Sequence, residues 1–359
     1  MTPYFYRVYM LIKNAIILLL LLNLVGCGGG GGGVQPTIYP VVSLSTSHAS
    51  VTENSGTTVT LTVTASKISD EDITVTLSTS GTATDGTDYS AVNGSSLTIT
   101  AGTTTAIKTF TITDNSIYEG NETVIVAIST VSGGSATENG TQIETITITE
   151  NESAPVITLA TSHTTVAENS GITITLTATS SQVADEDVVV TLASSGTATN
   201  GTDYSSLGGS TITIAAGATT GTITGTPTDD SIYEDDEVAT IAISTVSGGS
   251  AIESGTQSVS ITITENESAP TITLATSHTT VTENSGTTVT LTATASQVAD
   301  EDIIVTLAST GTAINGTDYS SLGGETITIS AGATTGTITG TPTDDSNSEV
   351  NETAIISID

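Results

Sequence analysis

The chain has 359 residues, of which 38 are Asp or Glu and only 4 are Lys or Arg, so its formal net charge is −34. The length is enough for two or three domains. Phosphate neutralisation requires clustered basic residues, so the composition excludes a nucleic-acid-binding protein. The single Cys excludes an internal disulfide and a cysteine-based zinc site.

The first 26 residues have the pattern of a secretory signal. Arg7 and Lys13 precede an apolar run at residues 15–25, which is shorter than the about 20 residues that a membrane-spanning helix needs. The run ends in Leu-Val-Gly-Cys27, which resembles the bacterial lipobox, and Cys27 is the only Cys of the chain. We therefore expect residues 1–26 to be removed and Cys27 to be lipidated. The alternative is an ordinary secretory signal with a Cys there by chance.

Residues 27–40 are predicted to be a linker between the lipidated Cys27 and the first folded unit. Six consecutive Gly follow Cys27, and such a segment behaves as a flexible tether. By resemblance to lipoprotein sorting rules, Gly28 in place of Asp favours the outer membrane. We expect a protein of the cell envelope that is held at the membrane by its lipid.

Three tandem copies of one unit follow the linker. The motif Glu-Asn-Ser-Gly begins at residues 53, 168 and 283, and the Asp of Gly-Thr-Asp-Tyr stands at 88, 203 and 318, always 115 residues apart. This constant spacing predicts folded repeats at residues 41–154, 155–269 and 270–359. Residue 359 corresponds to residue 129 of the first copy, so we expect the third copy to lack its final strand.

Alternation of apolar residues with Thr predicts β-strands in each copy. In the first copy Val59, Leu61 and Val63 alternate with Thr. The pattern predicts seven strands, around residues 41–51, 59–65, 73–77, 97–99, 110–112, 124–128 and 146–148. Seven short strands without a helical segment predict an all-β fold in which two sheets pack face to face as an immunoglobulin-like sandwich. Pro227 and Pro342 replace Ile112 of the fifth strand, which predicts a sheet edge.

Acidic residues follow alternate strands of this predicted sandwich. If successive strands run in opposite directions, one pole collects the loops after the first, third and fifth strands and the end of the seventh, with Glu53, Asp88, Asp114, Glu119, Glu122, Glu150 and Glu152. The acidic run 70–72 belongs to the opposite pole. Because basic residues are nearly absent, we expect Ca²⁺ to compensate this charge. The alternative is a solvated acidic surface that aids solubility. One His per copy, far from these loops in sequence, disfavours zinc.

These motifs resemble the Calx-beta domain of sodium–calcium exchangers and bacterial surface proteins. The resemblance rests on Val-Thr-Glu53 and on the segments 81–89, 96–102 and 114–122, and it extends over residues 41–359. It implies a two-sheet sandwich and calcium ligands in the same loops. The implied ligands are Glu53, Asp88, Asp114 and Glu119 in the first copy, Glu168, Asp203, Asp229, Asp230 and Glu234 in the second, and Glu283, Asp318, Asp344, Asp345 and Glu349 in the third.

This chain departs from the family pattern at several positions. The terminal Asp-rich run of the family is here Thr-Glu-Asn-Glu, which adds Glu150, Glu152, Glu265 and Glu267 as candidate ligands. Asn115 replaces the second Asp of a pair in the first copy, and the third copy has no terminal cluster. We therefore expect the best site in the second copy, a weaker one in the first and the weakest in the third.

The sequence favours a calcium-binding, lipid-anchored surface protein whose tandem domains are stiffened by Ca²⁺ for adhesion or as a stalk. Its protein or glycan partner is not identified by the sequence. The alternative is a passive spacer without ion binding, or the N-terminal part of a longer adhesin or enzyme. We do not expect catalysis in these repeats, because Ser and Thr lack a neighbouring base and no aromatic platform for a sugar accompanies the carboxylates.

Overall fold

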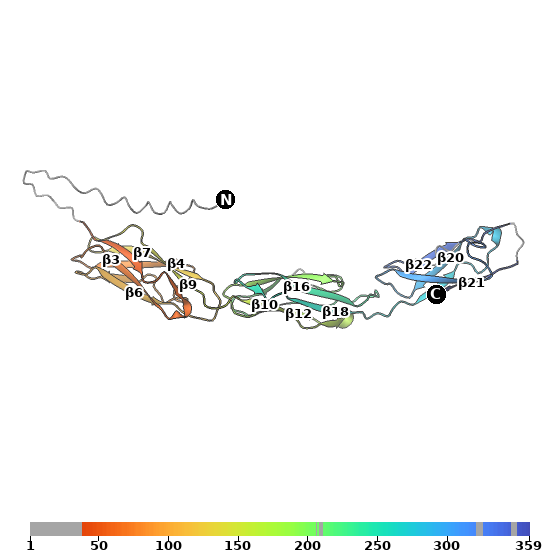
Figure 1. Ribbon diagram of the computed structural model, residues 1–359, viewed down its shortest axis with the longest axis horizontal. Helices are drawn as coiled ribbons and strands as arrows, with labels where there is room; N and C mark the ends of the chain where they lie inside the picture. The colour runs from red at the N-terminus through yellow and green to blue at the C-terminus, as the bar shows by residue number, and fades with distance from the viewer. Residues whose placement is uncertain (1–37, 206, 208–210, 321–325, 346–349) are drawn as a thin grey trace, which may run out of the picture.

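The computed structural model describes residues 38–205, 207, 211–320, 326–345 and 350–359. Three β-sandwich domains lie end to end, which confirms the predicted all-β fold (Figure 1). The predicted signal peptide, Cys27, most of the linker and Glu349 lie outside the described residues. Within the described part of the chain, no helix has the length and apolar character needed to cross a membrane.

Each of the first two domains has a four-stranded and a five-stranded sheet. In the first domain the smaller sheet has the order β6-β3-β1-β8 and the larger the order β2-β9-β7-β4-β5. The strands are β1 (Val41–Thr46), β2 (Ser50–Thr52), β3 (Thr58–Ala65), β4 (Ile73–Gly81), β5 (Ser96–Ile99), β6 (Thr105–Thr111), β7 (Glu122–Ser132), β8 (Thr137–Glu138) and β9 (Ile143–Thr149). A 3-10 helix, η1 (Glu53–Ser55), follows β2.

The second domain repeats this topology with the sheets β15-β12-β10-β17 and β11-β18-β16-β13-β14. Its elements are β10 (Val156–Thr161), β11 (Thr165–Ala167), η2 (Glu168–Ser170), β12 (Ile174–Ser180), β13 (Val188–Gly196), β14 (Thr211–Ile214), β15 (Thr220–Gly225), β16 (Glu237–Ser247), β17 (Ile252–Glu253) and β18 (Ser258–Thr264).

The third domain has two three-stranded sheets, β19-β20-β23 and β22-β21-β24. Its elements are β19 (Ile272–Thr276), η3 (Glu283–Ser285), β20 (Val289–Ala295), β21 (Ile303–Gly311), β22 (Thr326–Ile329), β23 (Thr335–Gly340) and β24 (Ala354–Ile358). Its described residues contain no strand equivalent to β18, as predicted, and none equivalent to β11. In the second domain β11 pairs in parallel with β18. The segment equivalent to β11 therefore lacks the partner that makes it a strand.

The prediction of one continuous first strand at residues 41–51 is wrong. The chain forms β1 in the smaller sheet, antiparallel to β3, and then β2 in the larger sheet, parallel to β9. The crossing occurs at Ser47, whose backbone N–H donates to the carbonyl of Thr60 at 2.9 Å and whose Oγ accepts from the backbone N–H of Thr60 at 2.9 Å. This switch delivers Glu53 to the end of the larger sheet.

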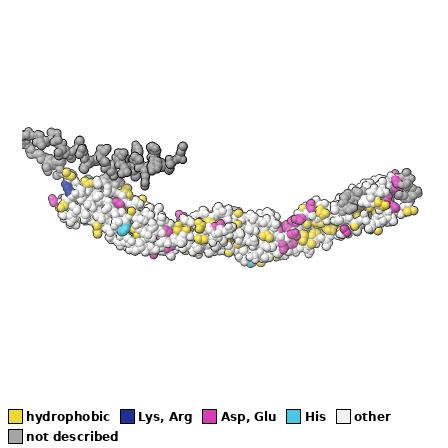
Figure 2. Space-filling view, viewed as in Figure 1, with side chains coloured by type: hydrophobic (Ala, Val, Ile, Leu, Met, Phe, Trp, Pro, Cys, Tyr) yellow, Lys and Arg dark blue, Asp and Glu magenta, His cyan; other side chains and the backbone are white. Residues whose placement is uncertain are grey.

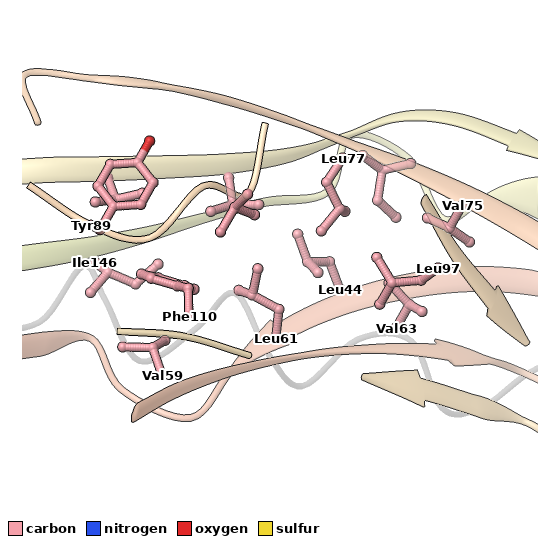
Figure 3. Packing of buried hydrophobic residues seen from close by; sticks show 14 of the residues in the cluster. Leu44, Val59, Leu61, Val63, Val75, Leu77, Tyr89, Leu97, Phe110 and Ile146 are labelled. Atoms are coloured by element: carbon pink, nitrogen blue, oxygen red, sulfur yellow. The ribbon is translucent and has the colours of Figure 1, made fainter. Parts of the chain in front are cut away.

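Alternating side chains of the two sheets fill the space between them (Figure 3). Val59, Leu61 and Val63 project from β3 and are fully buried, while their Thr neighbours face outward. The rings of Tyr89 and Phe110 meet edge to face, with centroids 5.6 Å apart. Dense packing of this kind holds the loops at the ends of the sandwich in fixed positions.

The fifth predicted strand lies at a sheet edge in every domain, as expected from proline. β6, β15 and β23 each end the order of their sheet. Pro227 lies two residues beyond β15 and forms an isolated bridge with Tyr204. The missing proline N–H therefore removes no bond from the ladder.

Candidate metal centre

Carboxylates from five segments of the first domain meet at the pole that faces the second domain. Glu53 is supplied by η1, Asp88 by the loop after β4, Glu119 by the loop between β6 and β7, and Glu122 by the start of β7. Glu150 and Glu152 follow β9. The alternating strand directions thus bring together residues that are almost 100 positions apart in the sequence.

Three of these carboxylates, Glu53, Glu150 and Glu152, form what we call the inner cluster. They offer oxygens that all lie within 4.8 Å of one another. Glu53 is only 3% exposed, and its Oε2 has no hydrogen-bond partner. Burial, together with the charges of Glu150, Glu119 and Glu152, raises the pKa of Glu53 to about 8. The inner cluster therefore contains a buried Glu53, two half-buried glutamates and carboxylate oxygens with unused acceptor capacity.

Glu150 is the organising residue of the inner cluster. Its Oε2 accepts from the backbone N–H groups of Glu119 at 2.6 Å and Gly120 at 2.8 Å, and its Oε1 accepts from those of Asn151 at 2.8 Å and Glu152 at 2.9 Å. Burial alone would raise the pKa of Glu150, but these donors hold it below its usual value. Glu150 is thus kept as a carboxylate at the centre of the pole.

Asp88, Glu119 and Glu122 form the outer cluster, again with oxygens within 4.8 Å of one another. Asp88 is buried, and its Oδ2 accepts from the backbone N–H of Thr84 at 2.6 Å. Burial, followed by the charge of Asp88, raises the pKa of Glu122 to about 7. Without a cation, the outer cluster holds protons that free carboxyl groups would release.

A glycine at the end of β4 allows the outer cluster to form. Gly81 has a φ of +117°, and a Cβ there would stand 2.1 Å from the carbonyl oxygen of Thr123. This close approach lets Ala83 N–H donate to the same carbonyl at 3.1 Å. The loop that carries Asp88 is thereby fixed beside Glu122.

The second domain contains the same two clusters. Glu168, Glu265 and Glu267 form its inner cluster, and Asp203, Glu234 and Glu237 form its outer cluster. Burial raises the pKa values of Glu168, Glu234 and Glu237 to about 7. The sequence contains no Lys or Arg after Lys108, so no such side chain compensates these charges.

The two domains differ at three positions beside the clusters, where Asn115, Gly120 and Asn121 of the first domain correspond to Asp230, Asp235 and Asp236 of the second. In the second domain the backbone N–H of Asp230 donates to Glu168 Oε1 at 3.2 Å, and its charge acts on Glu234. In the first domain Asn115 occupies this position, and its Nδ2 donates to Glu119 Oε2 at 3.1 Å. The second domain therefore carries three more carboxylates in this loop than the first.

The comparisons with known proteins agree with this geometry. The family model of the Calx-beta domain matches residues 36–152, 150–267 and 265–359. The chain belongs to the Calx-beta family. The resemblance seen in the sequence is confirmed. One solved Calx-beta structure, CBD12 of CALX1.1, is a calcium binding domain.

Solved structures of Calx-beta domains are among the similar folds. CBD12 from CALX1.2 is 16% identical, with a TM-score of 0.30, and the match covers 62% of this chain and 99% of that one. The calcium binding domain CBD12 of CALX1.1 is 18% identical, with a TM-score of 0.27 and coverages of 55% and 78%. The Yersinia pseudotuberculosis adhesin InvE is 14% identical, with a TM-score of 0.30 and coverages of 66% and 61%. No curated protein matches the sequence.

Not every predicted ligand of the first two Calx-beta domains lies inside a cluster. Asp114 lies outside both clusters of the first domain, but its charge acts on Glu152. Asp229 and Asp230 likewise lie outside both clusters of the second domain, and their charges raise the pKa of Glu267. These residues line the rim of the pole rather than its centre.

The third Calx-beta domain does not assemble the inner cluster in its described residues. Glu283 is partly exposed, whereas its counterparts Glu53 and Glu168 are buried. Glu283 Oε1 accepts from the backbone N–H of Asp345 at 3.4 Å, and Asp318 Oδ2 accepts from that of Ile314 at 2.7 Å. Asp344 is exposed. Glu150 and Glu152 follow β9 in the first domain, and the described residues of the third domain contain no strand equivalent to β9.

Sequence reasoning placed Glu122 at the acidic pole but did not count it among the ligands, and it did not single out Glu237. Both are the first residue of a long strand, directly before the alternating apolar positions. The resemblance supplied the ligand set and did not include them. Glu122 begins β7, which pairs with β9, and Glu237 begins β16, which pairs with β18. Because β9 and β18 lead into the glutamates of the inner clusters, this pairing was the signal that could have identified both residues.

The following domain also contributes charge to each pole, which the sequence did not reveal. The N–H of Tyr118 donates to the carbonyl of Val183 at 2.9 Å, and the N–H of Asp185 donates to that of Tyr118 at 3.2 Å. The charge of Asp185 acts on Glu119 and Glu122. Asp185 is the counterpart of Asp70, which the sequence assigned to the opposite pole of its domain, and at that end it meets the acidic pole of the preceding domain.

The same contact recurs between the second and third domains, through Tyr233, Val298 and Asp300. Acidic side chains gather at this junction on the face shown in Figure 2. Each complete acidic pole therefore lies at a junction between domains.

Proposed function

We propose that the first two Calx-beta domains bind Ca²⁺ at their acidic poles. The observation that carries this proposal is Glu53, a buried carboxylate with an unpartnered oxygen between two further glutamates. Ca²⁺ accepts six to eight oxygen ligands in irregular geometry, which suits clusters built from loops and strand ends. Calcium binding by Calx-beta homologues supports the same assignment.

The proposed ion also links neighbouring domains. Glu119 lies next to Tyr118, which makes the backbone contacts with the following domain, and Glu150 and Glu152 open the short connection between the two domains. Neutralising these carboxylates removes repulsion at the junction and restricts the movement of the connection. A site held at ten times its dissociation constant adds about 1.4 kcal/mol to the bound state.

In this proposal the protein is a lipid-anchored stalk or adhesin of the cell envelope. Cys27 attaches it to the membrane, the Gly-rich linker gives it reach, and calcium stiffens the tandem domains. An affinity of about 10⁻⁴ to 10⁻³ M is sufficient outside a cell, where calcium is abundant. Its further partner is a protein or glycan that the described residues do not identify.

The competing function is a spacer whose stiffness does not depend on an ion. Small-angle scattering of the three-domain chain separates the two functions. Calcium is expected to increase the maximum dimension and sharpen its distribution, and EDTA is expected to reverse the change. Identical profiles with calcium and with EDTA would favour the passive spacer.

Incorporation of radiolabelled lipid tests the anchor separately. Expression in a bacterial host is expected to label the wild-type chain, whereas the C27S variant is expected to remain unlabelled. Labelling of both chains, or of neither, would contradict the assignment of Cys27.

A further inference from the structure

Asn139 and Gly140 form an exposed bend between β8 and β9 of the first domain. The main chain of this bend is fastened to β1. The N–H of Asn139 donates to the carbonyl of Val42 at 2.9 Å, and Nε2 of Gln142 donates to the carbonyl of Asn139 at 2.5 Å. Oε1 of Gln142 in turn accepts from the N–H of Leu44 at 3.1 Å. The backbone of Asn139 therefore helps to hold the first strand in its sheet.

The side chain of Asn139 takes no part in this fastening. It has no hydrogen-bond partner in the described part of the chain. In the second domain Ser254 stands at the same position, and its main chain makes the same bonds with Ile157 at 2.9 Å and Gln257 at 2.6 Å. The glycine that follows has a φ of +63° in the first domain and +67° in the second. The bend therefore forms with either residue, and the fold does not require the amide group of Asn139.

An Asn-Gly pair carries its own reaction, because asparagine is thermolabile and glycine has no Cβ to obstruct an approach to it. The Gly nitrogen loses its proton and attacks Cγ of the asparagine side chain. An N–Cγ bond forms and the Cγ–Nδ2 bond breaks, so ammonia leaves and a cyclic imide remains. Water then opens the ring at either carbonyl, which yields aspartate or isoaspartate. The whole reaction consumes one water, releases one ammonia and involves no oxidation or reduction.

The fold distinguishes one of the four Asn-Gly pairs from the others. The pairs begin at Asn93, Asn139, Asn200 and Asn315. In three pairs the Gly N–H is already donated to a carbonyl, from Gly94 to Leu77 at 3.0 Å, from Gly201 to Tyr204 at 2.7 Å and from Gly316 to Tyr319 at 2.9 Å. Such a nitrogen must give up its hydrogen bond before it can attack. The N–H of Gly140 has no acceptor among the residues that the structure describes.

We propose that Asn139 is a modification site, at which the folded chain converts asparagine selectively to aspartate and isoaspartate. Both products add a negative charge to the bend, and isoaspartate also alters the main chain. Its chain runs through Cβ and Cγ, which adds one methylene group before Gly140 and turns the former carbonyl of Asn139 into a free carboxylate. Because that carbonyl accepts from Gln142, the modification displaces the link between the bend and β1. The consequence is a looser β1, the strand with which the first domain begins.

The rate of the reaction at each pair tests the proposal. The three-domain chain is incubated in heavy-oxygen water at mildly alkaline pH, and the peptides that contain the four pairs are then quantified by mass spectrometry. Ring opening inserts one heavy oxygen, which separates this reaction from any that occurs during digestion. We expect label to appear at Asn139 at least about fivefold faster than at the other pairs, the factor that corresponds to one hydrogen bond. Labelling of all four pairs at one rate would overturn the proposal.

The same incubation in denaturant shows whether the selection comes from the fold. All four pairs are expected to react at similar rates there, because the three protecting hydrogen bonds are lost. A preference for Asn139 that persists in the unfolded chain would overturn the proposal, since the preference would then come from the neighbouring sequence.

Two variants test the effect on β1, which amide hydrogen exchange of residues 41–46 measures. After incubation the wild type is expected to exchange faster in β1 than fresh protein does. N139S, which repeats the second domain at this position, is expected to show no change after the same incubation. Fresh N139D carries the charge on an ordinary main chain and is expected to exchange as the fresh wild type does. Exchange in β1 that is unchanged in isoaspartate-containing wild type, or that N139D raises equally, would overturn the role assigned to the main chain of Asn139.

Discussion

The backbone N–H of Glu119 donates to Oε2 of Glu150 at 2.6 Å. The Glu150 carboxylate thereby holds the loop between β6 and β7 against the end of β9. The same bond joins Glu234 to Glu265 in the second domain. The acidic pole is therefore organised by its own backbone before an ion arrives, and neighbouring carboxylates such as Glu53 keep free oxygens.

Replacement of Glu53 by Gln is expected to have opposite effects with and without calcium. Without calcium the E53Q variant removes a carboxyl group from a set of like charges, so the first domain becomes more stable above the pKa of about 8. With calcium the variant loses a ligand, and we expect affinity at this pole to fall at least about tenfold. Thermal unfolding in EDTA and in calcium measures both effects. E144Q, on β9 outside the clusters, is the control and is expected to change neither.

The pH dependence of stability follows from the raised pKa values. Burial raises the pKa of Glu53 from 4.5 to about 8 and that of Glu168 to about 7. A raised pKa means that the folded state holds protons that the unfolded state releases. The stabilising effect is therefore complete below pH 4.5 and is lost as the pH rises towards 7 and 8.

We accordingly expect the melting temperature in EDTA to fall between about pH 5 and about pH 8. Saturating calcium should abolish most of this fall, because the ion replaces the protons. Circular dichroism melts in matched buffers measure the difference. A melting temperature in EDTA that rises over this range would contradict the assigned burial of Glu53 and Glu168.

The charge of Asp185 is expected to weaken the contact between the first and second domains when calcium is absent, and to strengthen that contact when calcium is bound. Its charge acts on Glu119 and Glu122 across the junction. D185N should therefore make the calcium-free chain straighter and should reduce the straightening that calcium produces. The equivalent D70N lies at the free end of the first domain and is the matched control. Scattering profiles in which D185N and D70N behave alike in both conditions would show that Asp185 does not contribute to the junction.

The close approach at the end of β13 predicts a steric effect on the second domain. Gly196 has a φ of +113°, and a Cβ would stand 2.0 Å from the carbonyl oxygen of Val238. G196A is expected to destabilise the domain by about 2 kcal/mol or more, because it combines strain with overlap. G201A is the control, since Gly201 has a φ of +94° with open space around it, and should cost about 1 kcal/mol. Equal losses in chemical denaturation would contradict the steric account.

The sequence predicted those features that depend on local pattern. Alternation at Val59, Leu61 and Val63 identified a strand and its buried face, and Pro227 identified an edge. The break at Ser47 was missed because it depends on hydrogen bonds to Thr60, and no Gly or Pro marks it. Local pattern places a residue in a strand, but the partner of that strand is set by the rest of the domain.

Convergence of the acids at one pole followed from strand direction, whereas their division into two clusters did not. Which oxygens lie within reach of one another depends on side-chain placement. Glu122 lies on a strand rather than in a loop, and Asp185 enters from another domain. Neither position can be read from repeat spacing, because the spacing describes one domain at a time.

Isothermal calorimetry of calcium binding to the three-domain chain tests the central claim most directly. We compare the wild type with a variant that carries both E53Q and E168Q. The account predicts saturable uptake by the wild type, with a dissociation constant of about 10⁻⁴ to 10⁻³ M, and its loss in the double variant. Absence of heat from the wild type at about 10 mM calcium, ten times the upper end of that range, or an undiminished signal from the double variant, would contradict it.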